Sequence, residues 1–252
     1  MDAVSGVFLV GVGLIGGVWN AVAGGATLFT FPALMWVGLP PVVANATNYL
    51  AMLPSNAAAL PAHRADLKAI AGVLPRLVVV SASGALLGSL ILVFIDPALF
   101  MLLVPALIAL ATALFAFGDR VRAWLLDTAG SRSQVLVLAG LFLASVYGGF
   151  FGAGLGIILL AIAQLLGFRA FSVANAIKNL LATAFTLISI AVFGVGGLVA
   201  WPEAVTMMVG STVGGYLGGR LSHQVNERLL RRAVIAFGSL LSVVYAVRLL
   251  AG

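Results

Sequence analysis

The stretch Val43-Ala44-Asn45-Ala46-Thr47-Asn48 recurs as Val173-Ala174-Asn175-Ala176-Ile177-Lys178-Asn179, 130 residues further along and with one inserted residue. Glycines downstream of the two copies keep the same offset: Gly84 and Gly88 in the first, Gly214 and Gly218 in the second. Upstream, glycine clusters precede both copies: Gly24-Gly25 in the first, and Gly152, Gly154 and Gly156 in the second. Three landmarks in one order predict a tandem duplication within a single domain 1–252, with repeat one at 1–130 and repeat two at 131–252.

The composition around these landmarks is that of a membrane protein. The 252 residues are 63% hydrophobic and 8% charged, and the mean hydropathy is +1.21. A soluble domain carries about 25% charged residues, so this chain lacks the polar surface that water requires. Stretches such as 99–117 are apolar on every side, which favours helices over the alternating strands of a β-barrel. We therefore predict an all-α, polytopic transmembrane bundle of about eight to ten segments, each spanning helix needing about 20 apolar residues.

Apolar runs divide the chain at glycines, prolines and charges. We predict segments at 5–23, 27–37, 41–60, 70–95, 98–118, 134–151, 156–167, 171–197, 203–219 and 229–250. Two of them, 27–37 and 156–167, are too short to span a bilayer, and both follow the glycine clusters. They occupy equivalent places in the two repeats.

Loop charges predict how the repeats are oriented. Cations dominate the loops at 63–76, 119–132 and 220–232, whereas the turns at Asp96-Pro97 and Pro202-Glu203 hold none. Basic loops remain on the cytoplasmic side of an inner membrane. The chain then starts repeat one outside and repeat two inside, so the repeats are inverted and both termini are expected in the periplasm.

Inverted repeats with short, glycine-interrupted segments at matching positions are typical of alternating-access transporters. A broken helix presents backbone N–H groups and the positive end of its dipole near the midplane, where an anion can bind. We therefore expect an anion site between the repeats. Its candidate residues at the two breaks are Asn20, Gly24, Gly25, Gly152, Gly154 and Gly156. Close packing of helices through small residues is the alternative for these positions, and the one we favour for Gly84, Gly88, Gly210, Gly214 and Gly218.

Lys178 is the most informative single residue, because it lies eight residues into an apolar segment. A cation at the centre of a bilayer costs about 2.5–3.5 kcal/mol on insertion scales, so it must be paired, hydrated or near an end. One interpretation is electrostatic attraction of a substrate anion. The other is a lysine that snorkels to a membrane interface.

Amides and hydroxyls of the repeated motif form the second candidate group. They are Asn45, Thr47 and Asn48 in the first copy, with Asn175 and Asn179 in the second. Such groups can hold an oxyanion without adding another desolvated charge. Interhelical hydrogen bonding is the alternative.

Other function classes lack the residues that they need. The chain has no cysteine, no P-loop, no histidine cluster and no nucleophile with a neighbouring base, so we expect neither enzyme activity, nor a cofactor, nor a metal site. The literal GxGxxG at 11–16 sits inside an apolar helix and does not follow a strand. His63 and His223 lie in basic loops, where we expect both to be solvated. The +6 charge follows from the short cytoplasmic loops, and nucleic acid is not an expected partner.

Motifs in both halves resemble the TauE/SafE sulfite exporter family, which is also called the toluene sulfonate uptake permease family. The resemblance rests on Asn20–Gly25, Phe31–Leu34, Gly38–Pro41 and Ala44–Asn48, and on Gly148–Gly154 through Asn179 in the second half. It covers essentially the whole chain. It implies a bacterial inner-membrane transporter of sulfur-containing anions such as sulfite, sulfoacetate or other organosulfonates.

The sequence thus predicts a secondary transporter of a small anion in the lipid bilayer. A passive anion channel on the same fold and a membrane assembly or partner-binding subunit without transport are the alternatives. The coupling ion (proton or sodium), the direction of transport and assembly as a homodimer are left open.

Overall fold

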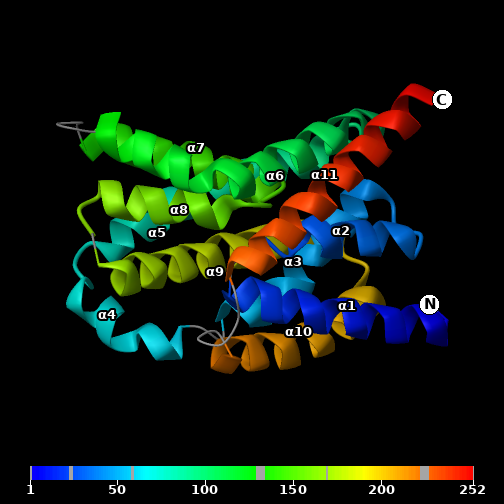
Figure 1. Cartoon of the computed structure of the whole chain (residues 1–252), viewed down its shortest axis with the longest axis horizontal. Helices are drawn as coiled ribbons and strands as arrows, with labels where there is room; N and C mark the ends of the chain where they lie inside the picture. Colours follow the sequence, from blue (N-terminus) through cyan, green and yellow to red (C-terminus); the bar gives the residue numbers. More distant parts are fainter. Residues whose placement is uncertain are drawn as a thin grey trace.

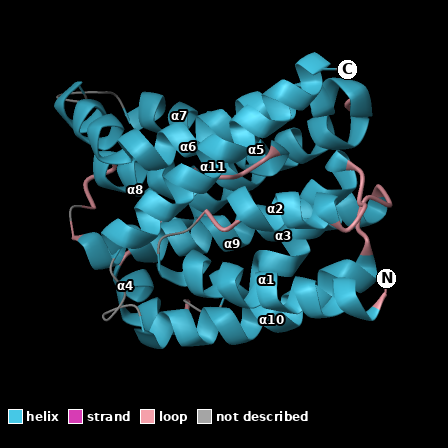
Figure 2. Cartoon of the chain, turned by 45° about the vertical axis from the view of Figure 1, so that its right-hand side comes forward, coloured by secondary structure: helices cyan, strands magenta, loops and turns pink. Residues whose placement is uncertain are grey.

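In a computed structural model, residues 2–22, 25–57, 60–128, 134–168, 170–221 and 227–251 are described. Within these ranges every regular element is a helix and no strand is present (Figure 2). The helices are α1 (Ala3–Val22), α2 (Thr27–Trp36), α3 (Pro41–Ala57), η1 (Pro61–His63), α4 (Arg64–Ala69), α5 (Leu74–Phe94), α6 (Pro97–Thr128), α7 (Gln134–Phe150), α8 (Leu155–Leu165), α9 (Phe171–Val195), α10 (Trp201–Leu221) and α11 (Glu227–Ala251). The predicted helical bundle is confirmed.

Two helices, α2 and α8, are the short segments that the sequence predicted after the glycine clusters. They have 10 and 11 residues, which at about 1.5 Å per residue is about half the thickness of a bilayer core. Each is followed by a longer helix that carries one copy of the repeated motif, α3 after α2 and α9 after α8.

The largest difference from the predicted boundaries is in α6. The sequence predicts an end near residue 118, but the helix continues to Thr128. Hydropathy marks the point where the apolar run ends, at Asp119 and Arg120. Charged residues and leucines in this stretch are compatible with a helix in water, so the backbone remains helical beyond the apolar run. The predicted loop at 63–76 likewise contains the short helix α4.

The outer surface of the bundle is apolar, as a protein in lipid requires. Among the described residues, four helical stretches are long and apolar enough to cross a membrane by length and composition: Ala3–Ala21, Leu74–Phe94, Pro97–Val121 and Ser172–Val195. Side chains such as Val7 (77% exposed), Val79 (66%) and Leu143 (66%) point away from the core. An apolar surface of this extent would be a liability in water and is matched by lipid.

Small residues bring two pairs of helices into close contact. A Cβ added at Gly88 of α5 would meet the carbonyl of Val146 in α7, and one at Gly214 of α10 would meet the carbonyl of Leu14 in α1. Glycines on these faces therefore let the backbones approach each other. The packing interpretation of Gly84, Gly88, Gly210, Gly214 and Gly218 agrees with these contacts.

The main helix contacts join the first half of the chain to the second half. Helix α1 packs on α10 and α7 packs on α5, so each pair joins one half to the other. Helices α3 and α9 contact each other in the middle of the molecule, and each also packs against one of these pairs, α3 on α10 and α9 on α5 (Figure 1). The short helices α2 and α8 lie against α3 and α9, respectively. This arrangement places the two helical breaks on either side of the α3–α9 contact.

Candidate functional site

One cavity of about 80 Å³ lies where the N-termini of α2 and α8 meet α3 and α9. Gly25 and Thr27 line it from the start of α2, and Gly152, Gly154 and Gly156 line it around the start of α8. The first N–H groups of a helix have no acceptor within that helix, and the helix dipole is positive at this end. Two helix N-termini from different halves of the chain therefore face the same small space.

Seven of the twelve predicted site residues line this cavity: Asn20, Gly25, Asn48, Gly152, Gly154, Gly156 and Lys178. Four others lie elsewhere: Asn45, Thr47, Asn175 and Asn179. Gly24 lies outside the described residues. The site prediction thus separates into one group around a cavity and another group within the helix packing.

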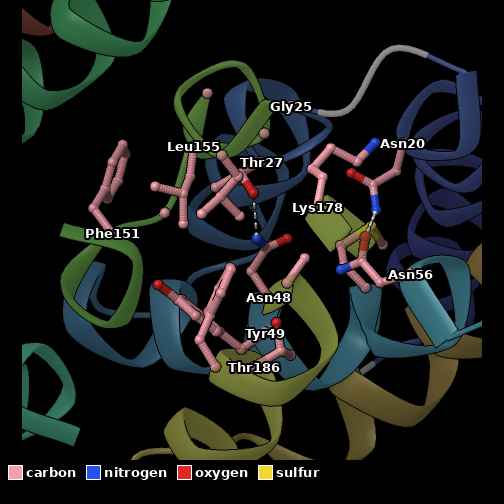
Figure 3. Close-up of a pocket in the computed structure, with 17 residues that line it drawn as sticks. Asn20, Gly25, Thr27, Asn48, Tyr49, Asn56, Phe151, Leu155, Lys178 and Thr186 are labelled. Atoms are coloured by element: carbon pink, nitrogen blue, oxygen red, sulfur yellow. Dashed lines mark hydrogen bonds between the residues drawn. The ribbon is translucent and has the colours of Figure 1, made fainter. Parts of the chain in front are cut away.

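Lys178 supplies the positive charge of the cavity. Its side chain is partly buried and passes over the start of α8, where the Cδ atom lies 3.5 Å from the position of a Cβ added to Gly156. Figure 3 shows its ammonium nitrogen turned towards Asn20, on the opposite side of the cavity from Phe151. Within the described part of the chain, no carboxylate forms an ion pair with it, and no acidic residue lines the cavity.

Asn48 occupies the corresponding place at the start of α2. Its Nδ2 donates to Thr27 Oγ1 (3.1 Å; dashed in Figure 3), and its Oδ1 accepts a hydrogen bond from Thr30 Oγ1 (2.6 Å). Thr27 Oγ1 is the acceptor in the first of these bonds, so its own hydroxyl hydrogen is left to donate into the cavity. Neutral donors therefore lie at the start of α2, whereas the ammonium group of Lys178 from α9 lies near the start of α8.

Asn20 and Asn56 complete the polar side of the cavity. Nδ2 of Asn20 donates to Ser55 Oγ and to Asn56 Oδ1, both at 2.8 Å. Since Asn56 accepts through its oxygen, its Nδ2 hydrogens remain for a ligand. Phe151 and Leu155 lie on the opposite, apolar side (Figure 3). The cavity can therefore hold an anionic head group near Lys178 and a small apolar body near Phe151.

The four predicted residues outside the cavity serve other contacts. Asn45 is fully buried and donates to the carbonyl of Phe150 at the end of α7 (2.8 Å). Thr47 Oγ1 accepts from the backbone N–H of Ala200 (3.0 Å), just before α10. Asn179 is 7% exposed within the helix packing, and Asn175 contacts His63. The bonds of Asn45 and Thr47 therefore agree with the alternative interpretation, in which these side chains hold segments of the bundle together by hydrogen bonds.

Glycine is required at the break between α7 and α8 because the backbone turns into the left-handed region. Gly152 has φ +73° and Gly154 has φ +76°, which side chains with a Cβ adopt only at a cost of about 1–2 kcal/mol. Two tyrosine hydroxyls bond the carbonyls of this segment: Tyr49 donates to Gly148, and Tyr147 donates to Ala153 (2.7 Å). These bonds fix the start of α8 relative to α3 and α7.

Sequence reasoning missed several lining residues that follow a simple spacing. Asn48, Met52 and Asn56 lie four residues apart on α3 and therefore share one face. Three residues of α9 also line the cavity: Lys178, Ala182 and Thr186. Each follows one of these α3 residues by 130 positions. The repeat offset, extended beyond the motif in steps of four residues, would have found Asn56 and Thr186. The repeat spacing does not identify the other lining residues, which include Tyr49, Phe151, Leu155, Leu159 and Phe185.

The expectation that His63 is solvated is wrong. Its side chain is 20% exposed, its Nδ1 lies 3.6 Å from Asp66 Oδ2, and its Nε2 lies 3.4 Å from Asn175 Nδ2. The loop containing η1 and α4 folds back on α9, which sequence periodicity does not reveal. His223 lies outside the described residues.

Comparison with known proteins assigns the chain to a family. The model of the sulfite exporter TauE/SafE family matches residues 9–245. The chain belongs to this family. The TauE/SafE match spans both breaks and both copies of the repeated motif, and the chain is therefore a multi-pass membrane protein of a transporter family.

Curated TauE/SafE-like relatives cover nearly the whole chain. A Haemophilus influenzae protein named a probable membrane transporter is 33% identical over 89% of this chain and 88% of its own length. A Sinorhizobium protein with a similar name is 28% identical over 97% of this chain and 92% of its own. The Escherichia coli K12 protein YfcA, also named a probable membrane transporter, is 26% identical over 92% and 86%. No solved structure matches the chain.

Proposed function

We propose that this TauE/SafE protein is a secondary transporter that carries a small sulfur-containing anion, such as sulfite, sulfoacetate or another organosulfonate, across the inner membrane. The observation that carries the proposal is the cavity in which two helix N-termini and Lys178 meet, with no carboxylate among the described residues that line it. The Lys178 ammonium and the two helix N-termini all favour negative charge. The sulfur chemistry comes from the family description, "Sulfite exporter TauE/SafE".

The chemistry of the cavity fits a sulfonate or sulfite head group. Such a group has three oxygens, and each can accept hydrogen bonds from a different side. The Lys178 ammonium, the Asn56 amide and the Thr27 hydroxyl are donors from three different helices, α9, α3 and α2. Backbone N–H groups at the start of α8 add a fourth direction.

Alternating access between two inverted repeats is the mechanism that we propose. Support comes from the packing of α1 on α10 and of α7 on α5. These two pairs correspond to each other, because α1 and α7 begin the two repeats and α5 and α10 follow at about the same offset. Further support comes from the cavity itself, because three lining residues of α3 and three of α9 are related by the repeat offset of 130. A site between two such units can be exposed to either side when one unit rocks against the other.

Anion flux into liposomes containing the purified protein tests the proposal. We expect saturable flux of sulfite or sulfoacetate, and much weaker flux of sulfate and chloride, when the four anions are compared side by side. Saturation distinguishes a carrier from a passive channel, which would conduct far faster and without a conformational cycle. Well-folded protein that moves none of these anions would contradict the proposal and favour a partner-binding role.

The orientation of the repeats is tested separately by reporter fusions. We expect a reporter placed after residue 252 to show the periplasmic pattern, and one inserted in the basic loop near Arg132 to show the cytoplasmic pattern, because cations are retained inside. A cytoplasmic C-terminus would refute the inverted arrangement of the repeats. It would not bear on the anion site, which the flux assay tests.

A further inference from the structure

Lys178 carries a positive charge that has no carboxylate partner among the described residues, which suits it to a second role beyond holding the anion. The chain has 13 Lys and Arg residues and 7 Asp and Glu residues, and among those that the structure describes only Lys178 lines the cavity. In the described part of the chain no carboxylate neutralises it. Its charge must therefore be balanced by the bound anion or removed by loss of a proton.

From this isolated cation we infer that Lys178 itself carries the co-transported proton, so that one proton crosses with each anion. The inference rests on the proposed function and names its coupling ion. A bound anion pairs with the ammonium group, and the neutral donors Thr27 and Asn56 can hold a second negative charge such as that of sulfoacetate. The loaded site therefore contains no unpaired cation when it passes through the low-dielectric middle of the bilayer. The empty site with a charged lysine cannot do so easily, because an unpaired ion there lacks both water and a partner.

The proton balance of the cycle is simple. On the side of entry, the neutral amine of Lys178 takes a proton from water and the resulting ammonium binds the anion. After reorientation the anion leaves, and the ammonium returns its proton to water on the other side. The neutral amine then reorients with the empty site. One anion and one proton have moved in the same direction, and no oxidant, metal or other co-reactant is needed.

Of the titratable groups around the cavity, Lys178 is the best placed to carry the proton. Tyr49 on α3 shares the cavity, but its hydroxyl donates to the carbonyl of Gly148, and Tyr147 on α7 donates to Ala153. At the end of α9 where the chain enters from α8, His63 of η1 contacts Asn175, one helical turn from Lys178. The remaining charged groups on elements packed against α9 are Arg64, Asp66 and Lys68 of α4 and Arg76 of α5. None of these four lines the cavity, and Asp66 lies beside His63.

Arginine at position 178 separates anion binding from proton carriage. A guanidinium is charged at every accessible pH, so Lys178→Arg can balance an anion but cannot release a proton. The chain offers a matched control, because Lys68 is its only other lysine and is exposed on α4. The Lys68→Arg substitution makes the same chemical change outside the cavity.

Accumulation of sulfoacetate in liposomes is the measurement. Both acidic groups of sulfoacetate remain ionised near neutral pH, so the probe does not itself carry the proton. With the membrane potential clamped at zero and the outside more acidic by one unit, we expect wild type and Lys68→Arg to accumulate it about tenfold, since one pH unit is a tenfold proton ratio. We expect no accumulation by Lys178→Arg, which should retain exchange of internal for external sulfoacetate at a reduced rate.

A second measurement on wild-type protein keeps the inference testable if the arginine variant does not fold. A pH-sensitive dye inside the liposomes should report one proton entering with each sulfoacetate. Sulfoacetate flux without proton movement, or accumulation by Lys178→Arg equal to wild type, would overturn the inference and leave the proposed function standing. Loss of coupling in His63→Gln with coupling intact in Lys178→Arg would assign the proton to His63 and also overturn it. Absence of any flux in wild type would instead refute the proposed function.

Discussion

Lys178→Gln is expected to lower saturable anion flux by at least about a hundredfold. Removing one member of a buried charge pair costs about 3–5 kcal/mol, and each 1.4 kcal/mol corresponds to about a factor of ten in binding. Glutamine keeps a hydrogen-bond donor of similar reach, so the change isolates the charge. The measurement is the initial rate of sulfite or sulfoacetate entry into liposomes at several concentrations.

The matched control for this change is Lys68→Gln, which removes the other lysine from an exposed position on α4. We expect its flux to equal that of wild type. The melting temperature of Lys178→Gln in detergent should not fall, because the variant no longer buries an unpaired cation. A glutamine variant that transports like wild type would show that Lys178 does not serve the anion.

Gly152→Ala is expected to combine a large loss of stability with loss of transport. Its φ of +73° costs an L-residue about 1–2 kcal/mol. The added methyl group would also lie 2.9 Å from both the carbonyl oxygen of Gly148 and the hydroxyl of Tyr49. Overpacking against such fixed groups costs about a further 1–3 kcal/mol, and it displaces the start of α8 from the cavity.

Gly167→Ala is the control that separates these two causes. Gly167 follows the other end of α8 with φ +97°, and a Cβ there would meet no atom within 4 Å. We expect it to lose only the conformational part, about 1–2 kcal/mol of unfolding free energy, and to retain transport. Thermal unfolding in detergent and sulfoacetate flux, measured on both variants, check the difference. Equal losses in the two variants would mean that the contact with Gly148 and Tyr49 is not a constraint.

Much of the fold could be predicted from the sequence because each feature leaves a local pattern. Apolar runs predicted the helices, including the short α2 and α8, since a bilayer accepts only helices or closed barrels. Asn48 and Lys178 were both predicted as site residues from the repeated motif and the apolar surroundings, and both line the cavity. The end of α6 was missed, because the hydropathy pattern ends at Asp119 while the backbone hydrogen bonding continues.

Within the candidate site, the sequence identified chemical groups but could not tell which of them face one another. Asn45 and Asn48 lie three residues apart and looked equivalent, yet Asn45 bonds the carbonyl of Phe150 while Asn48 lines the cavity. Tyr49 gave no signal at all, because its role depends on a carbonyl 99 residues away. Contacts over such separations depend on how α3 meets α7, which neither segment encodes alone.

The sequence by itself determined that the chain is a helical membrane protein with two short segments after glycine clusters, and it predicted two related halves and a site that includes Lys178. These follow from hydropathy, spacing and charge, which are properties of neighbouring residues. Only the tertiary structure decided that the two breaks converge on one cavity with Lys178, and that His63 reaches Asn175. The physical reason is that convergence depends on packing between the halves, through the glycine contacts of α1 with α10 and α5 with α7, rather than on any local preference.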